Sequence, residues 1–175
     1  SFHAEEQILF DGRTDANGRA GFTARFQTGD ASPGMLLAGF VTRVFEESGD
    51  FSIDRFTIPY SPYLSYVGIQ TPKGDKARGM LLTDTTHTVH LVTLDPDGRV
   101  ISRPELDVSI YKISWRWWWD AGPDNLASYI GNTDHQPVFN TRVSTRNGEG
   151  SFQFRIDYPE WGRYLIRVVD PLSGH

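Results

Sequence analysis

Apolar side chains recur at every second residue in short runs along this chain, and Gly, Pro, Asn and Asp separate the runs. A period of two is typical of β-strands, in which alternate side chains point to one face. The clearest run covers residues 87–94, and the turn sequence Asp95-Pro96-Asp97-Gly98 follows it. Because no helical pattern recurs between the runs to supply the crossovers of a parallel sheet, the sequence predicts an all-β fold with antiparallel sheets.

The expected strands fall into two groups separated by Pro59 and Pro62, which remove backbone donors and hold the chain extended. About four strands are expected before this junction and about seven after it. A complete sandwich of the immunoglobulin or fibronectin-III type uses about seven. We therefore expect a partial β domain over residues 1–60 and a complete antiparallel β-sandwich over residues 61–175. The four early strands are expected at residues 7–10, 22–26, 35–45 and 51–58, with a hairpin turn at Asn17-Gly18 between the first two.

The longest strand candidate covers residues 106–119, and its apolar positions change from even to odd numbers within it. Such a change moves the buried face to the other side of the strand. A β-bulge or bend near residues 110–113 would accommodate it. After this segment, Asp124 is expected to cap one short helical turn.

Composition excludes several classes of function. The net charge of −5 comes without any cluster of Lys and Arg, so we expect no nucleic-acid partner. The chain has no cysteine, which excludes disulfides, thiolate metal sites, cysteine nucleophiles and a thioester within this chain. No run approaches the roughly 20 apolar residues that cross a bilayer, so no membrane contact by this segment is expected.

Nothing in the sequence indicates an active site. There is no Gly-x-Ser-x-Gly elbow, P-loop or Rossmann glycine pattern. His87 and His90 would point to opposite faces of one strand, so they cannot bind zinc together with His135 without distortion. The Asp95 turn begins like a calcium loop, but its twelfth position is Leu106 rather than Glu. We predict no catalytic residue, no metal ligand and no cofactor.

The most unusual feature is a tryptophan-rich run, Trp115-Arg116-Trp117-Trp118-Trp119. The indoles could form a flat platform for sugar rings, or they could cover the core or an adjoining domain, with Arg116 stacked beside them. We favour structural and interface roles for this run and for Trp161. Trp118 would point away from its neighbours, which makes it the best candidate for an exposed contact with another domain.

From about Tyr60 onward the sequence resembles the macroglobulin-like domains of bacterial alpha-2-macroglobulins, in particular the one shortly before the protease bait region. The resemblance rests on Tyr66-Val67-Gly68-Ile69, Asp95-Pro96-Asp97-Gly98, Val108 to Tyr111 with the tryptophan run and Asp120, and the ending Trp161-Gly162-Arg163-Tyr164-Leu165 with Asp170 and Ser173-Gly174-His175. Residues 1–59 resemble the later strands of the preceding macroglobulin domain.

The resemblance implies a non-catalytic module of a broad-spectrum protease inhibitor in the periplasm or cell envelope, often lipid-anchored. Its partners would be neighbouring domains of the same polypeptide and, through the full-length protein, target proteases. The family's thioester and bait residues would lie outside this chain, so no functional residue is carried over. The alternatives are a carbohydrate-binding or adhesin-type sandwich. Missing strands in the first part would leave unpaired edges, which predicts self-association of the fragment or packing against the second part.

Overall fold

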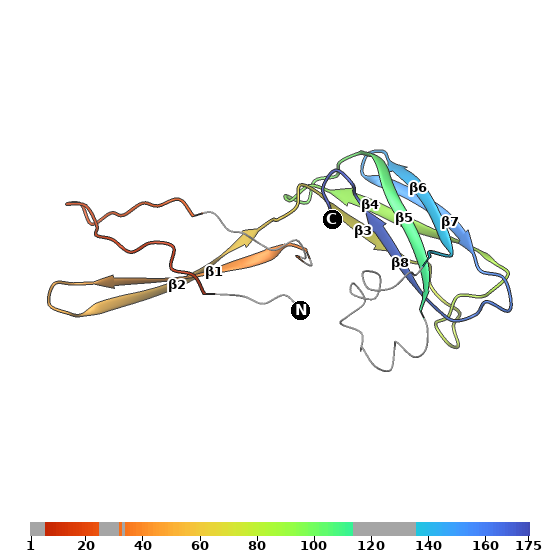
Figure 1. Cartoon of the computed structure of the whole chain (residues 1–175), viewed down its shortest axis with the longest axis horizontal. Coiled ribbons are helices and arrows are strands. Elements are labelled where there is room, and N and C mark those ends of the chain that lie inside the picture. Colours follow the sequence, from red (N-terminus) through yellow and green to blue (C-terminus); the bar gives the residue numbers. More distant parts are fainter. Residues whose placement is uncertain (1–5, 25–31, 33, 114–135) are drawn as a thin grey trace.

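The computed structural model describes residues 6–24, 32, 34–113 and 136–175 of the chain, and all regular elements in this part are β-strands. All strand pairs are antiparallel, which confirms the predicted all-β sandwich class (Figure 1). The strands, in chain order, are β1 (Leu36–Phe45), β2 (Phe51–Tyr60), β3 (Tyr66–Gln70), β4 (Thr86–Leu94), β5 (Arg103–Ile113), β6 (Phe139–Thr145), β7 (Glu149–Arg155) and β8 (Arg163–Val169).

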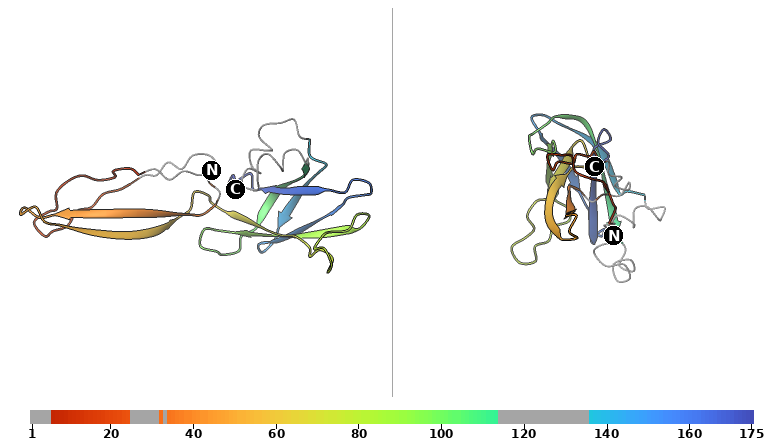
Figure 2. Two further views of the ribbon diagram at one scale, coloured as in Figure 1. Left: turned by 90° about the horizontal axis from the view of Figure 1, so that it is seen from below. Right: turned by 90° about the vertical axis from the view of Figure 1, so that its left-hand side faces the viewer.

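Strands β3 to β8 form two three-stranded sheets that face each other. One sheet has the order β3-β4-β7 and the other the order β6-β5-β8. Figure 2 shows the two layers from the side. Each sheet places one set of alternate side chains toward the other sheet, which is how the period of two in the sequence closes a core.

The core lies between these sheets and is formed by the alternating apolar residues of the central strands. Each fully buried aliphatic or aromatic side chain contributes roughly 1.5–3 kcal/mol relative to exposure. Seven side chains form the buried cluster, namely Val89, Leu91, Leu106, Val108, Ile110, Phe152 and Phe154. The structure therefore has its hydrophobic centre within the second group of expected strands.

Strands β1 and β2 form a separate two-stranded sheet, a hairpin that projects from the sandwich (Figures 1 and 2). Its register runs without interruption from Leu36 opposite Tyr60 to Phe45 opposite Phe51. Many of its large apolar side chains are exposed among the described residues, and Leu37 is 73% exposed. A two-stranded sheet is marginally stable alone, so the hairpin depends on whatever packs against it. The proposed division at residue 60 stays a prediction.

The prediction of two early strands at residues 7–10 and 22–26 is wrong where the structure describes them. Residues 7–10 and 22–24 form no ladder, although a turn is present where Gly18 donates its N–H to Asp15 O. The rings of Phe10 and Phe22 stack with their centroids 5.3 Å apart. The apolar residues of the two segments therefore meet through their side chains, without the backbone pairing that defines a strand. Phe26 lies outside the described residues.

The turn predicted after residues 87–94 is present. Asp95 donates its N–H to Arg99 O and accepts from Gly98 N–H, as expected for the Asp95–Gly98 reversal. The Asn147-Gly148 hairpin also forms, with both residues at positive φ. However, Val100 makes only an isolated bridge to Leu94, so the described part of the sandwich has six strands rather than the expected seven.

The ladder irregularity in β5 lies at its beginning, so the expected bulge near residues 110–113 is wrong, while the alternative of a bend there stays a prediction. The register with β6 shifts between Arg103 and Leu106, whereas pairing with β8 is continuous from Asp107 to Ile113. Pro104 lies within the shifted stretch, and it has no N–H to donate to a ladder. The missing donor gives a physical reason for the irregularity there. Residues 114–119, the rest of the expected strand, and the helical turn at Asp124 lie outside the described residues.

Candidate functional site

Of the residues predicted to have structural or interface roles, Trp161 lies within the described part of the chain. Trp115, Arg116, Trp117, Trp118 and Trp119 lie outside the described residues. Trp161 lies in the connection between β7 and β8, where it is 60% exposed. Its role as a structural or interface residue therefore stays a prediction.

The two histidines of β4 differ in burial. His87 is partly buried at the end of the core-facing row, where its Nε2 lies 2.7 Å from Leu82 O and its ring packs near Phe154. His90 is exposed, and His135 lies outside the described residues. Within the part of the chain that the structure describes, no group of three or more His, Cys, Asp or Glu side chains could hold a metal ion.

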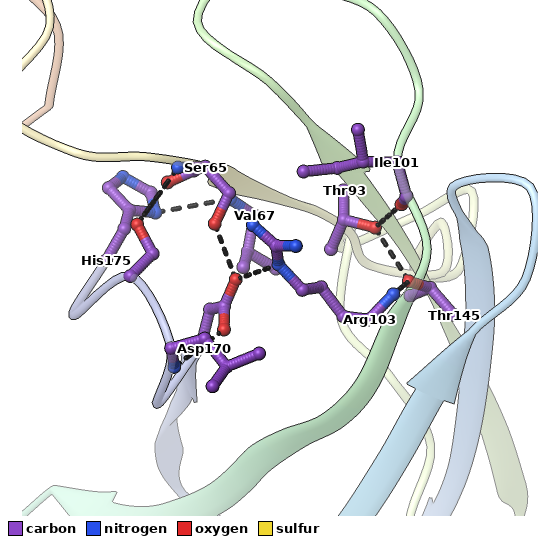
Figure 3. Close-up of polar contacts among 10 residues, drawn as sticks. Ser65, Val67, Thr93, Ile101, Arg103, Thr145, Asp170 and His175 are labelled. Carbon is purple, nitrogen blue, oxygen red and sulfur yellow. Dashed lines mark hydrogen bonds and ion pairs between the residues drawn. The ribbon is translucent and has the colours of Figure 1, made fainter.

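The densest polar arrangement lies at the end of the sandwich that adjoins the hairpin, and its centre is the carboxylate of Asp170 (Figure 3). Asp170 is fully buried. Its Oδ2 accepts hydrogen bonds from Ser65 Oγ at 2.5 Å and from Arg103 Nε at 2.6 Å. Its Oδ1 accepts the N–H of Leu172 at 3.0 Å. Three segments far apart in sequence therefore meet on one carboxylate.

A second serine ties the same segments together through the backbone. The N–H of Ser65 donates to Ser173 Oγ at 3.0 Å, and the Ser173 hydroxyl donates to Ser65 O at 2.9 Å. Ser65 immediately precedes β3, and Ser173 follows β8. One hydroxyl thus satisfies both backbone groups of Ser65, as a neighbouring strand would.

His175 completes this arrangement, which we call the clasp and define as Ser65, Arg103, Asp170, Ser173 and His175. Its Nδ1 accepts the N–H of Val67 at 3.2 Å (Figure 3). Its ring meets Tyr63 and Tyr66 edge-on, with centroids 5.1 and 4.9 Å away. The acceptor role of Nδ1 requires a neutral ring with its proton on Nε2.

The electrostatics of the clasp follow from burial and from these partners. Burial alone would raise the pKa of Asp170, but hydrogen bonds from Ser65, Arg103 and the Leu172 N–H, with the Arg103 charge, hold that pKa below its ordinary value. Burial also lowers the pKa of His175, and the charge of Asp170 offsets only part of that effect. Both shifts favour the charge states that the hydrogen bonds require.

The clasp contains Ser, His and Asp side chains but lacks the geometry of a nucleophilic triad. In a triad the imidazole accepts the serine proton and the carboxylate orients the imidazole. Here Ser65 donates directly to Asp170, and the His175 Nδ1 is occupied by a backbone N–H. A carboxylate with a lowered pKa is a poor base for a serine hydroxyl. The groups are arranged to hold backbone segments rather than to activate a nucleophile.

A buried threonine pair adjoins the clasp through Arg103 (Figure 3). Thr93 Oγ1 donates to Ile101 O at 2.5 Å and lies 2.7 Å from Thr145 Oγ1, which accepts the Arg103 N–H at 2.8 Å. Because Thr93 gives its proton to Ile101, Thr145 must be the donor between the two hydroxyls. Among the described residues, no buried side-chain nitrogen or oxygen lacks a partner.

One open depression lies beside the β7–β8 connection, and its charged groups already have partners. Arg155 Nε contacts Asp157 at 2.6 Å, and Glu160 contacts Lys112 at 2.6 Å. The Tyr164 hydroxyl donates to Glu160 O. No convergent set of unpaired polar groups faces the depression from these residues, so it has no chemistry comparable to that of the clasp.

Sequence reasoning noted Asp170, Ser173 and His175 only as part of a resemblance, and it missed Ser65 and Arg103 as their partners. The partners are separated by 105 residues for Ser65 and Asp170 and by 67 for Arg103 and Asp170. No spacing rule connects residues so far apart. The available signal was the group of polar residues that immediately follows the last apolar strand.

The fold and the clasp define a class: an antiparallel β-sandwich module whose entry and exit segments are fastened to each other. Among the described residues there is no helix long and apolar enough to cross a membrane. The protein-family model described as bacterial macroglobulin domain 6 matches residues 68–175. The chain therefore belongs to the bacterial alpha-2-macroglobulin family, as the resemblance had indicated. No curated protein and no solved structure matches the chain.

Proposed function

We propose that this chain is a non-catalytic structural module of a bacterial alpha-2-macroglobulin-like protease inhibitor. The observation that carries the proposal is the family match, which covers nearly the whole sandwich. The geometry of the clasp supports it, because its serine, histidine and carboxylate groups satisfy backbone groups and each other. In this role the sandwich keeps other parts of the inhibitor in position.

The proposed partners are neighbouring domains of the same polypeptide and, through the whole inhibitor, its target proteases. The bait and thioester regions would lie outside this chain, which has no cysteine. Exposed apolar residues of the β1–β2 hairpin support contact with a further β element, since such patches mark interaction sites. The proposed location is the periplasm or cell envelope, which agrees with the general placement of the family.

Protease protection assays test this function in the whole protein that carries this sequence. We expect it to block cleavage of a large protein substrate by an added endopeptidase while a small chromogenic peptide is still cleaved. The Leu106→Asp substitution places a charge in the core and should abolish the block, whereas Asp97→Asn on an exposed turn should leave it intact. A block that survives Leu106→Asp, after circular dichroism confirms loss of the sandwich, would contradict the proposal.

Glycan arrays provide the complementary test of a sugar-binding module. The proposed role predicts no reproducible glycan signal from this chain. Binding that disappears in the Trp115→Ala and Trp117→Ala variants would replace the inhibitor module with a carbohydrate-binding one. Many near-identical sandwich repeats in the same gene would instead favour an adhesin.

A further inference from the structure

The clasp connects segments that the strand pairing of the two sandwich sheets does not join. Strand β3 is already paired with β4 from Tyr66 to Gln70, and β8 is already paired with β5. The bonds from Asp170 and Ser173, beyond β8, reach instead to Ser65, in the linker of residues 61–65. Their main effect therefore falls on the linker between the hairpin and the sandwich.

A continuous series of contacts runs from the segment before the hairpin to the sandwich. The Tyr63 hydroxyl donates to Ser32 O at 2.6 Å, and the Tyr63 ring packs against His175. The N–H of Asp170 donates to His175 O at 2.8 Å, and Asp170 is paired with Arg103 at the start of β5. Each link joins a different part of the chain, so the linker is held on both sides.

The linker is also braced internally. Ser61 Oγ donates to Tyr63 O at 2.7 Å and lies 2.7 Å from the Tyr66 hydroxyl. The Tyr63 and Tyr66 rings meet edge-on, with centroids 5.9 Å apart. Both rings also pack against His175, so the linker is packed on this side rather than free to rotate.

We propose that residues 170–175 act as a conformational lock that fixes the direction in which the β1–β2 hairpin leaves the sandwich. While Ser173 holds Ser65 and the His175 ring packs against Tyr63, the linker has one conformation. When these contacts are removed, the linker rotates and the hairpin samples several directions, although the sandwich keeps its fold. The orientation of the hairpin is thus controlled by residues that lie far from it in the sequence. This inference concerns the isolated chain and holds whether or not the inhibitor function is correct.

Distance measurements between two spin labels test the lock directly. The chain has no cysteine, so Ser48→Cys at the hairpin tip and Asp97→Cys on a sandwich turn give two unique attachment sites. The labelled parent is expected to show one narrow distance distribution by pulsed electron resonance. Ser173→Ala and His175→Ala are each expected to broaden that distribution or split it into several peaks.

Two further variants separate the lock from general loss of stability. Ser102→Ala removes a matched hydroxyl, which accepts the Asn147 N–H at 3.0 Å within the sandwich, and should leave the distribution narrow. His175→Phe keeps a ring against Tyr63 and Tyr66 but loses the acceptor for Val67, so intermediate broadening is expected. Circular dichroism should show that all variants retain the sandwich. A broad distribution in the parent, or identical narrow distributions in all folded variants, would overturn the proposal.

Discussion

Arg103 Nε lies 2.6 Å from Asp170 Oδ2, and this ion pair joins the first residue of β5 to the residue that follows β8. The Asp170 side chain is fully buried, and that of Arg103 is 18% exposed. A buried carboxylate without its cation is unfavourable because neither water nor a counter-charge replaces the lost interaction. Removing Arg103 should therefore be more costly than breaking an exposed ion pair.

Removing the cation should destabilise the sandwich strongly. We expect Arg103→Met to lower the free energy of unfolding by about 3–5 kcal/mol, since it leaves Asp170 charged and buried. Urea denaturation followed by circular dichroism measures the change. Arg99→Met, which breaks the exposed pair with Asp97, is the control and should have little effect. Equal effects of the two substitutions would show that burial does not decide the strength of the pair.

Stability should fall in two steps as the pH decreases. The folded-state pKa of His175 is lowered, so its contribution is complete above about pH 6.5 and is lost as the pH falls through the folded value. Asp170 also has a lowered pKa, so its contribution is complete above about pH 4 and is lost further down. Urea midpoints measured between pH 8 and pH 3 should show both steps. His175→Phe should remove the upper step, and its persistence in that variant would exclude His175 as the origin.

Two glycines at turns should differ in their tolerance of alanine. Gly148 has a φ of 79°, and a Cβ there would lie 2.6 Å from Val100 Cβ. Gly98 has a φ of 80°, but nothing lies within 4 Å of a Cβ at that position. Gly98→Ala should cost about 1–2 kcal/mol for the left-handed backbone alone. Gly148→Ala should cost more, because Val100 must also move. Thermal unfolding of both variants measures the difference, and equal midpoints would contradict the close approach.

The Thr93 and Thr145 hydroxyls should be energetically coupled. Either single Val substitution leaves polar partners unsatisfied, among them Ile101 O for Thr93 and the Arg103 N–H for Thr145. The double variant removes both hydroxyls together, so it should be less destabilising than the sum of the singles, by about 0.5–3 kcal/mol. A double-mutant cycle in urea tests this. Strict additivity would mean that the 2.7 Å contact contributes nothing.

The hairpin should make the isolated chain self-associate. Phe45 and Phe51 lie opposite each other near its tip and are 67% and 56% exposed. The pair of substitutions Phe45→Lys and Phe51→Lys should lower the average mass at high protein concentration, because charged edges resist pairing. Light scattering over a range of concentrations gives the result. A chain that is already monomeric throughout would show that the hairpin packs only within its own molecule.

Local signals predicted the parts of the fold that depend on local chemistry. Alternation placed β4, and the Asp95 turn followed from proline and glycine preferences. The same alternation failed at Phe10 and Phe22, where apolar spacing gave ring stacking without a strand ladder. Strand formation there depends on a partner edge, which no single segment encodes.

The candidate site was less predictable than the fold for the same physical reason. Asp170 is stabilised as a buried carboxylate by hydrogen bonds from Ser65 and Arg103. Only the folded topology brings these two residues to it. Likewise, the only sequence signal for the register shift between β5 and β6 was Pro104, and its effect depends on the strand beside it. Sequence patterns indicate which residues are buried more readily than which polar groups meet.

The meeting of Ser65 and Ser173 at one end of the sandwich has a mechanical consequence. A pull applied to the chain on either side of the sandwich would enter and leave the domain at this one pole. The tension would fall first on the short hydrogen-bonded stretch there, while the ladders of the two sheets would be spared. The hydrogen bonds between Ser65 and Ser173 would therefore break before the strands of the sandwich separate.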